Sequence, residues 1–184
     1  ADEPVSMIDA SLRATVLKSL RSLRDDVGIS ILYITHDLAT AYHISDEIVV
    51  LYQGGVAEAG SVEAVIQEPK HPYTQLLVAS IPWPDPKRRW GQDAVLTQGD
   101  VFHLETQGCK FAPRCARAMD ICRQSRPPLF QTEPSRAVTC YLYQDSPVLE
   151  PSEIGRVLGQ NGRRAEQAQG ATPAPGVPQV GLPG

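Results

Sequence analysis

An amphipathic helix followed by a short apolar run is the feature that most restricts how this chain folds. The helix is predicted to begin at Asp9 or Ser11 and to end at Gly28. Apolar residues recur within it at steps of four, four, three and four: Leu12, Val16, Leu20, Leu23 and Val27. Residues 29–34 have the apolar, β-branched bias typical of a parallel strand buried on both faces. His36 then follows the carboxyl end of that strand, where α/β sheets hold their ligands.

The same pattern continues to about residue 80, where turn and cap residues divide the chain into short elements. In chain order these are a helix over residues 38–44 capped by Asp37, a strand over 47–52, a hairpin turn at Gly54-Gly55, a strand over 56–59, a helix over 62–67 capped by Gly60-Ser61, and a helix from Pro72 to about Ser80. The alternation of helices and strands predicts an α/β fold class for this region.

Two adjacent carboxylates and a later histidine supply the groups that ATP hydrolysis requires, namely a metal ligand, a base that orients water and a partner for the γ-phosphate. Asp2 is suited to hold Mg²⁺, Glu3 to polarise the attacking water, and His36 to donate a hydrogen bond to the γ-phosphate. Taken alone, Asp-Glu-Pro is more often a turn or helix start, and Thr-His-Asp is most often a strand end with a helix cap. Their order, with a helix and a strand between them, favours the catalytic interpretation.

The run Asp-Glu-Pro-Val-Ser-Met-Ile-Asp at residues 2–9 and the later Tyr-Ile-Thr-His-Asp resemble the ATP-binding subunit of ABC transporters. In that family the positions of Asp2 and Glu3 are the Walker B carboxylates, and His36 matches the switch histidine. Ser6 and Asp9 match the D-loop, which lies at the dimer interface. The resemblance implies an ATPase that uses ATP and Mg²⁺ and sandwiches two ATPs between two ATPase subunits.

The phosphate loop of such ATPases, Gly-x-x-x-x-Gly-Lys-Ser/Thr, does not occur in the 184 residues. Only Ala1 precedes Asp2, whereas a Walker B motif follows an apolar strand. We therefore expect the chain to be the C-terminal part of a longer ABC ATPase whose phosphate loop, Q-loop and signature motif lie upstream. By itself the chain is expected neither to bind ATP tightly nor to hydrolyse it.

A second motif follows the ATPase region, where residues 68–77 read Glu-Pro-Lys-His-Pro-Tyr-Thr-Gln-Leu-Leu. Physically this is a helix entry with proline in the first turn. It resembles the C-terminal extension of the ATPases of oligopeptide, dipeptide and nickel importers, in which His71 is expected to be structural. The resemblance implies a subunit that powers import of peptides or related solutes. Its implied partners are a second ABC ATPase subunit, two membrane permeases and an extracytoplasmic substrate-binding protein.

All four cysteines lie within 32 residues: Cys109, Cys115, Cys122 and Cys140. Clustered thiolates suit zinc or a [4Fe–4S] cluster, whereas two disulfides are the expectation for a secreted chain. The spacing is wider than the Cys-x2–4-Cys of most zinc sites. Residues 108–115, Gly-Cys-Lys-Phe-Ala-Pro-Arg-Cys, also resemble the tail of peptide-importer ATPases, and relatives of this tail resemble iron–sulfur proteins. The resemblance favours a [4Fe–4S] cluster over zinc and over free or paired thiols.

Composition divides the chain into four predicted parts: the C-terminal part of an ABC ATPase domain over 1–80, a proline-rich linker over 81–94, the cysteine-containing extension over 95–149, and a disordered tail over 150–184. The formal charge of −4 gives no indication of a nucleic-acid partner. No stretch approaches the roughly 20 apolar residues needed to cross a bilayer. We therefore expect peripheral attachment at the cytoplasmic face of the cell (inner) membrane.

Two alternatives stay open on the sequence. In one, the chain is a truncated product that acts as a metal-binding or interaction module and has no ATPase activity. In the other, it belongs to a soluble ABC ATPase that is not involved in transport, although the His-Pro-Tyr-Thr run at residues 71–74 disfavours this.

Overall fold

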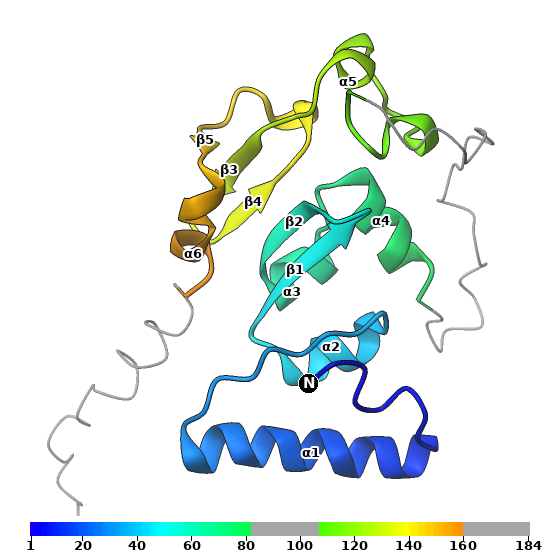
Figure 1. Cartoon of the computed structure of the whole chain (residues 1–184), viewed down its shortest axis with the longest axis vertical. Helices are drawn as coiled ribbons and strands as arrows, with labels where there is room; N and C mark the ends of the chain where they lie inside the picture. Colours follow the sequence, from blue (N-terminus) through cyan, green and yellow to red (C-terminus); the bar gives the residue numbers. More distant parts are fainter. Residues whose placement is uncertain (82–106, 160–184) are drawn as a thin grey trace, which may run out of the picture.

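The computed structural model describes residues 1–81 and 107–159 (Figure 1). Most of the expected linker, the start of the extension and residues 160–184 of the expected tail lie outside the described residues. The elements are α1 Ala10–Val27, α2 Leu38–Ile44, β1 Glu47–Tyr52, β2 Gly55–Ser61, α3 Val62–Gln67, α4 Pro72–Ala79, η1 Ala112–Arg114, α5 Asp120–Gln124, β3 Leu129–Glu133, β4 Arg136–Val138, η2 Tyr141–Tyr143, β5 Val148–Leu149, η3 Pro151–Glu153 and α6 Ile154–Val157.

The strands of the described chain form one antiparallel sheet in the order β1-β2-β4-β3-β5. The pairing of β2 with β4 places Ala59 opposite Ala137 and joins the β1–β2 hairpin to the strands that follow Cys122. Figure 1 shows α3 and α4 beside the β1–β2 hairpin, with α6 beside β3 and β4. The extension is therefore continuous with the sheet that precedes it.

The helix predictions from caps and periodicity are confirmed for the first four helices. Asp37 caps α2 by accepting hydrogen bonds from the N–H groups of Ala39 and Thr40, at 2.9 and 3.3 Å. Gly28 ends α1 in the left-handed conformation, with φ 70°. None of the helices in the described part of the chain has the length and apolar character needed to cross a lipid bilayer.

The hairpin turn lies one residue earlier than predicted. Its two central residues are Gln53 and Gly54, with φ 46° and 74°, and Tyr52 pairs with Gly55. Two-residue turns with positive φ at both central positions match the twist of the flanking strands. Because Gly55 is already paired, β2 begins one residue before the predicted strand. At its other end β2 continues to Ser61, which pairs with Glu47.

Three apolar clusters hold these elements together. The first packs Val50, Ala57 and Val65 against the hairpin. The second joins Ala112, Cys122, Phe130 and Tyr141 in the extension. The third packs Leu129, Ala137, Leu149 and Val157 between β3, β4 and α6. Val157 is only 1% exposed. The prediction of a disordered tail is therefore wrong for residues 151–157, which are helical. They are ordered because α6 covers apolar side chains of the sheet.

The predicted buried strand at residues 29–34 differs most from the structure. Its one β-bridge in the described chain pairs Ile34 in parallel with Asp2, and Leu32 is 78% exposed. Helix α1 likewise contains no buried residue. Its Arg24 donates to the Ile44 carbonyl at the end of α2, at 3.2 Å, and to the Asp46 carboxylate just beyond it, at 3.0 Å. A parallel strand is buried only when other strands and helices cover it. The described residues supply only part of that cover.

Candidate functional site

The start of the chain pairs with the apolar run before His36 and so brings two predicted catalytic residues together. Ala1 and Glu3 form the parallel hydrogen bonds of this pairing, with Ile34 N–H bonded to the Ala1 carbonyl at 2.8 Å and Glu3 N–H to the Ile34 carbonyl at 2.9 Å. Both segments end at the same edge, because parallel neighbours run in the same direction. Glu3 and His36 therefore meet just beyond the paired residues.

The Glu3 carboxylate contacts His36 twice through one oxygen. Oε1 lies 2.5 Å from the imidazole Nδ1 and accepts the His36 backbone N–H at 3.1 Å. The hydrogen bond and charge of Glu3 raise the pKa of His36 above its ordinary value of 6.5. The His36 side chain is nevertheless 80% exposed, so its ring is open to a ligand.

The backbone at Glu3 is also unusual. Its φ of 44° lies in the left-handed region, which costs a residue other than glycine about 1–3 kcal/mol. Ser6 supports this turn, because its backbone N–H and its hydroxyl both donate to the Glu3 carbonyl, at 3.2 and 3.0 Å. Strained conformations that neighbours hold in place concentrate at functional sites.

The other two predicted residues are placed nearby in the chain but are not drawn into this contact. Asp2 is exposed and joins the pairing through its backbone. Asp9 precedes α1, where its carbonyl accepts the N–H of Leu12 and Arg13 and its side chain forms no cap hydrogen bond. The structure thus assembles Glu3, Ser6 and His36, while Asp2 and Asp9 remain exposed at either end of the turn.

The Glu3→Gln variant of this chain is expected to lower the pKa of His36 toward 6.5. In the wild type the negative charge of Glu3 favours the imidazolium form of His36. The amide removes that charge, and with it the ion pair that forms below the His36 pKa. Proton NMR titration of the imidazole signals measures this directly. Glu63→Gln, on the exposed face of α3, is the matched control. An unchanged His36 titration in Glu3→Gln would show that the contact does not form in solution.

The four predicted metal ligands, Cys109, Cys115, Cys122 and Cys140, all line one small cavity, which we call the cysteine cavity. None forms a disulfide. Burial raises the pKa of Cys140 to about 11, with the other three cysteines adding to the effect. Burial likewise raises the pKa of Cys109 and Cys115. The thiols of Cys109, Cys115 and Cys140 are therefore neutral near pH 7 and pack as small apolar groups.

The arrangement does not support the expected [4Fe–4S] cluster or the zinc alternative. Among residues 1–81 and 107–159, no three or more His, Cys, Asp or Glu side chains are placed to hold a metal ion. The donor set has suitable chemistry, because four soft sulfurs face one cavity.

A glycine fixes how closely the two ends of this segment approach. The N–H of Cys109 donates to the Cys122 carbonyl at 2.8 Å. A Cβ atom on the preceding Gly108 would lie 2.3 Å from the same carbonyl oxygen. Gly108 is therefore required for the backbone contact that brings Cys109 beside Cys122.

The His-Pro-Tyr-Thr run forms the entry to α4 and a junction with the extension. His71 caps the helix, because its Nδ1 accepts the Tyr73 N–H at 3.0 Å, and the ring also bonds to the Thr139 backbone. The rings of Tyr73 and Phe111 pack with their centroids 5.6 Å apart. His71 thus has a structural position, and its burial lowers its pKa to about 4.

The His71→Asn variant is expected to make stability less dependent on pH between about 6.5 and 4. His71 is neutral in the folded chain until about pH 4, whereas in the unfolded chain it takes up a proton near 6.5. The contribution of neutral His71 to the free energy of unfolding is therefore complete above pH 6.5. That free energy falls by about 3 kcal/mol as the pH drops from 6.5 to 4. Asparagine keeps an N-cap acceptor and does not titrate. Urea unfolding at several pH values tests this, and parallel curves for both proteins would contradict it.

Sequence analysis missed the buried ion pair beneath this junction. Glu58 on β2 and Arg136 on β4 are 0% and 1% exposed, and Arg136 Nη2 lies 2.6 Å from Glu58 Oε1. The one available signal was a carboxylate inside the small apolar run Val-Ala-Glu-Ala at residues 56–59. Its partner is 78 residues away, so sequence spacing gave no indication of it.

Comparison with known proteins relates the His-Pro-Tyr-Thr run and the first three cysteines to one family. Residues 57–122 match the family described as "Oligopeptide/dipeptide transporter, C-terminal region". The oligopeptide transport ATP-binding protein OppF of Haemophilus influenzae is 40% identical over 141 residues, which cover 76% of this chain and 42% of OppF. The chain is homologous to the oligopeptide and dipeptide transport ATP-binding proteins. The family resemblance expected from the sequence is thereby confirmed.

Two further relatives give the same result. YkfD of Bacillus subtilis is 40% identical over 152 residues, 82% of this chain and 46% of YkfD. The dipeptide transport ATP-binding protein DppF of H. influenzae is 37% identical over 143 residues, 77% of this chain and 43% of DppF. The chain therefore spans less than half the length of these curated relatives. Its mixed helices and strands are consistent with the C-terminal part of an ABC ATPase.

Proposed function

We propose that this chain is the C-terminal part of an ATP-hydrolysing subunit that powers import of peptides or related small solutes. The observation that carries the proposal is the Glu3–His36 contact, at the positions that ABC ATPases use for hydrolysis. The substrate class is supported by the match over residues 57–122 and by relatives named as oligopeptide and dipeptide transport ATP-binding proteins.

The proposed roles follow from the groups at this edge. The exposed carboxylate of Asp2 would hold Mg²⁺, which would supply positive charge to offset that of the phosphates. Both contacts of Glu3 to His36 use Oε1, which leaves Oε2 to orient a water and accept its proton. The exposed His36 ring, whose pKa Glu3 raises in favour of the protonated form, donates a hydrogen bond to a phosphate oxygen.

Exposed apolar side chains support the proposal that the functional protein is longer. Met7 and Leu32 are 97% and 78% exposed, and Leu12, Ile34 and Val27 are also exposed. Soluble proteins seldom leave such a group of large apolar residues uncovered. We infer that polypeptide outside this chain, including the phosphate loop, Q-loop and signature motif, covers them in the functional protein.

The remaining partners are proposed on the same basis. The exposed segment from Ser6 to Asp9 faces a second ABC ATPase subunit, as the D-loop resemblance implies. Two membrane permeases receive the motion of the dimer, and an extracytoplasmic binding protein delivers the solute. The complex lies at the cytoplasmic face of the cell membrane, to which this subunit attaches peripherally.

Immunoblotting of source cells with an antibody to this chain tests the proposal. We expect a polypeptide much heavier than 20.0 kDa that sediments with membranes and co-purifies with two integral membrane proteins. A product near 20.0 kDa in the soluble fraction would instead identify a truncated binding module. A heavy product that never associates with membranes would identify an ABC ATPase outside transport.

The cysteine cavity is a second candidate site. We infer that metal bound to this chain, whether a [4Fe–4S] cluster or zinc, is held there, because all four thiols face the same cavity. Binding requires the cysteines to rearrange, because the side chains form no metal site as they lie in the described residues. Iron, sulfide and zinc are measured on protein purified without oxygen. Iron with sulfide, or zinc, lost in Cys115→Ser would support the inference; absence of iron and zinc would reduce the cavity to a structural core.

A further inference from the structure

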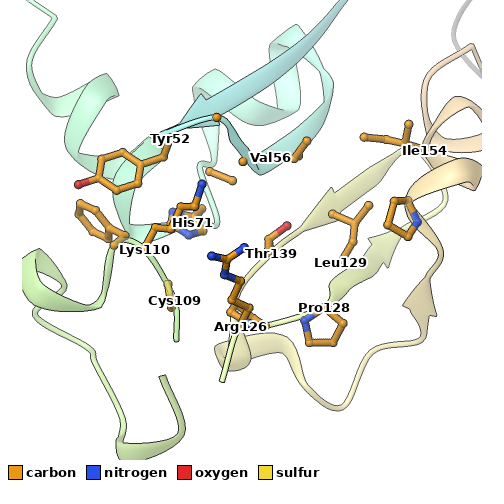
Figure 2. A pocket seen from close by; sticks show the side chains of 16 residues that line it. Tyr52, Val56, His71, Cys109, Lys110, Arg126, Pro128, Leu129, Thr139 and Ile154 are labelled. Atoms are coloured by element: carbon orange, nitrogen blue, oxygen red, sulfur yellow. The ribbon is translucent and has the colours of Figure 1, made fainter. Parts of the chain in front are cut away.

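A second, larger pocket lies between the hairpin turn and the extension, and neither the proposed ATPase site nor the cysteine ligand set explains it. Its volume is about 460 Å³, within the range of small-molecule sites. One side is apolar and is formed by Val56, Leu129 and Ile154, while Tyr52 flanks the opposite side (Figure 2). Phe111 also lines the pocket, and its ring centroid lies 5.3 Å from that of Tyr52. Because the pocket uses residues from β2, β3 and α6, it exists only once the extension joins the sheet.

The charges around this pocket all have one sign. Lys110 and Arg126 line it, and no carboxylate is found among the described residues of its lining. Figure 2 shows the Arg126 side chain extending into the pocket toward Thr139. His71 adds no charge near neutral pH, because burial lowers its pKa to about 4.

These two cations have free hydrogen-bond donors. Lys110 Nζ donates to the Gln53 carbonyl, which fixes the ammonium at the hairpin turn and leaves its other N–H groups available. The guanidinium of Arg126 makes no hydrogen bond or ion pair with any other residue in the described ranges. Arg126 is exposed, whereas two cations nearby have carboxylate partners, Lys70 with Glu133 and Arg136 with Glu58, each at 2.6 Å.

We propose that this pocket binds a small anionic ligand with an apolar or aromatic body, such as a hydrophobic carboxylate. The guanidinium of Arg126 receives the anionic group, because its planar fork matches a carboxylate. Lys110 adds a second positive charge, and the body of the ligand lies against Val56, Leu129 and Ile154. Two cations balance one or two negative charges, which disfavours a polyphosphate. The proposal does not depend on the proposed ATPase function.

The probe pair 4-phenylbutyrate and 4-phenyl-1-butanol tests the proposal on the full 184-residue chain. The two molecules share the same apolar body and differ in the charged group. We expect the acid to bind at least tenfold more tightly than the alcohol and to shift the methyl NMR signals of Val56 and Ile154. Equal binding of both probes, or acid binding without shifts at these methyl groups, would overturn the proposal.

Two variants locate the anion. Arg126→Gln is expected to weaken 4-phenylbutyrate binding about tenfold, while Arg123→Gln, an exposed arginine on α5 outside the pocket, leaves it unchanged. Circular dichroism confirms that both variants stay folded. Equal affinity for wild type and Arg126→Gln would overturn the role of Arg126. Displacement of the acid by inorganic tripolyphosphate at lower concentration would overturn the ligand class in favour of a polyanion.

Discussion

The Arg136→Met variant is expected to lower the free energy of unfolding of this chain by about 3–5 kcal/mol. Methionine fills much of the same volume but leaves the carboxylate of Glu58 buried without its cation. Removing one partner of a buried ion pair is far more destabilising than removing a surface charge, because the remaining ion can neither reach water nor find another counter-ion.

The position of this pair makes the effect large. Arg136 donates from Nε and Nη2 to Glu58 Oε1, at 3.0 and 2.6 Å, and from Nη2 to the Glu68 carbonyl. Glu58 Oε2 also accepts the backbone N–H groups of Lys70 and His71, at 3.1 and 2.9 Å. One carboxylate therefore ties β2 to β4 and to the loop that leads into α4. Loss of the pair is expected to loosen the extension together with the His-Pro-Tyr-Thr junction.

Urea unfolding followed by circular dichroism measures the effect. Arg123→Met removes the same charge from the exposed face of α5 and is expected to change stability by less than about 0.5 kcal/mol. Combining Glu58→Gln with Arg136→Met is expected to be less destabilising than Arg136→Met alone, since glutamine keeps an acceptor for the backbone N–H groups and carries no charge. If Arg136→Met and Arg123→Met had equal stability, Arg136 would not be buried against Glu58 in solution.

Local signals predicted the first four helices correctly, because caps and periodicity act over a few residues. Asp37, Gly28 and Ser61 begin or end the helices at the expected positions. The short strands β3 and β4 were not predicted. Strand β4 pairs with β2, which is far away in the chain, and β3 joins the sheet by pairing with β4. The same distance hid the Glu58–Arg136 pair, which only the assembled sheet brings together.

The two candidate sites differ in how far the sequence predicts their geometry, for a related reason. The Glu3–His36 contact follows from two parallel segments that end together, a geometry that sequence order conveys. The placement of the cysteines around one cavity depends instead on the close backbone approach at Gly108, which spacing alone does not specify. Composition also predicted burial for residues 29–34, where Leu32 is in fact 78% exposed. Apolar residues indicate that a strand is normally covered, but they do not identify the part of the protein that covers it.

The Glu3→Gln variant of the longer ATPase proposed above is expected to lower the rate of ATP hydrolysis about 10²–10⁴-fold. Glutamine has nearly the same shape as glutamate but cannot accept the proton of the attacking water. ATP binding is expected to change little, because the phosphates are held by the metal and by other motifs. Phosphate release gives the rate, and a fluorescent ATP analogue gives the affinity. Glu63→Gln on α3 is the matched control and should keep wild-type activity.

A His36→Gln variant separates the role of the base from that of its neighbour. If Glu3 accepts the proton and His36 only stabilises phosphate charge, His36→Gln should retain more activity than Glu3→Gln, because its amide still donates a hydrogen bond. The Glu3–His36 hydrogen bond also predicts that activity of the wild type declines as pH rises through the elevated pKa of His36. In His36→Gln that decline should disappear. Equal losses in both variants, with an unchanged alkaline limb, would mean that the pair acts by holding the backbone turn at Glu3 and not by proton transfer.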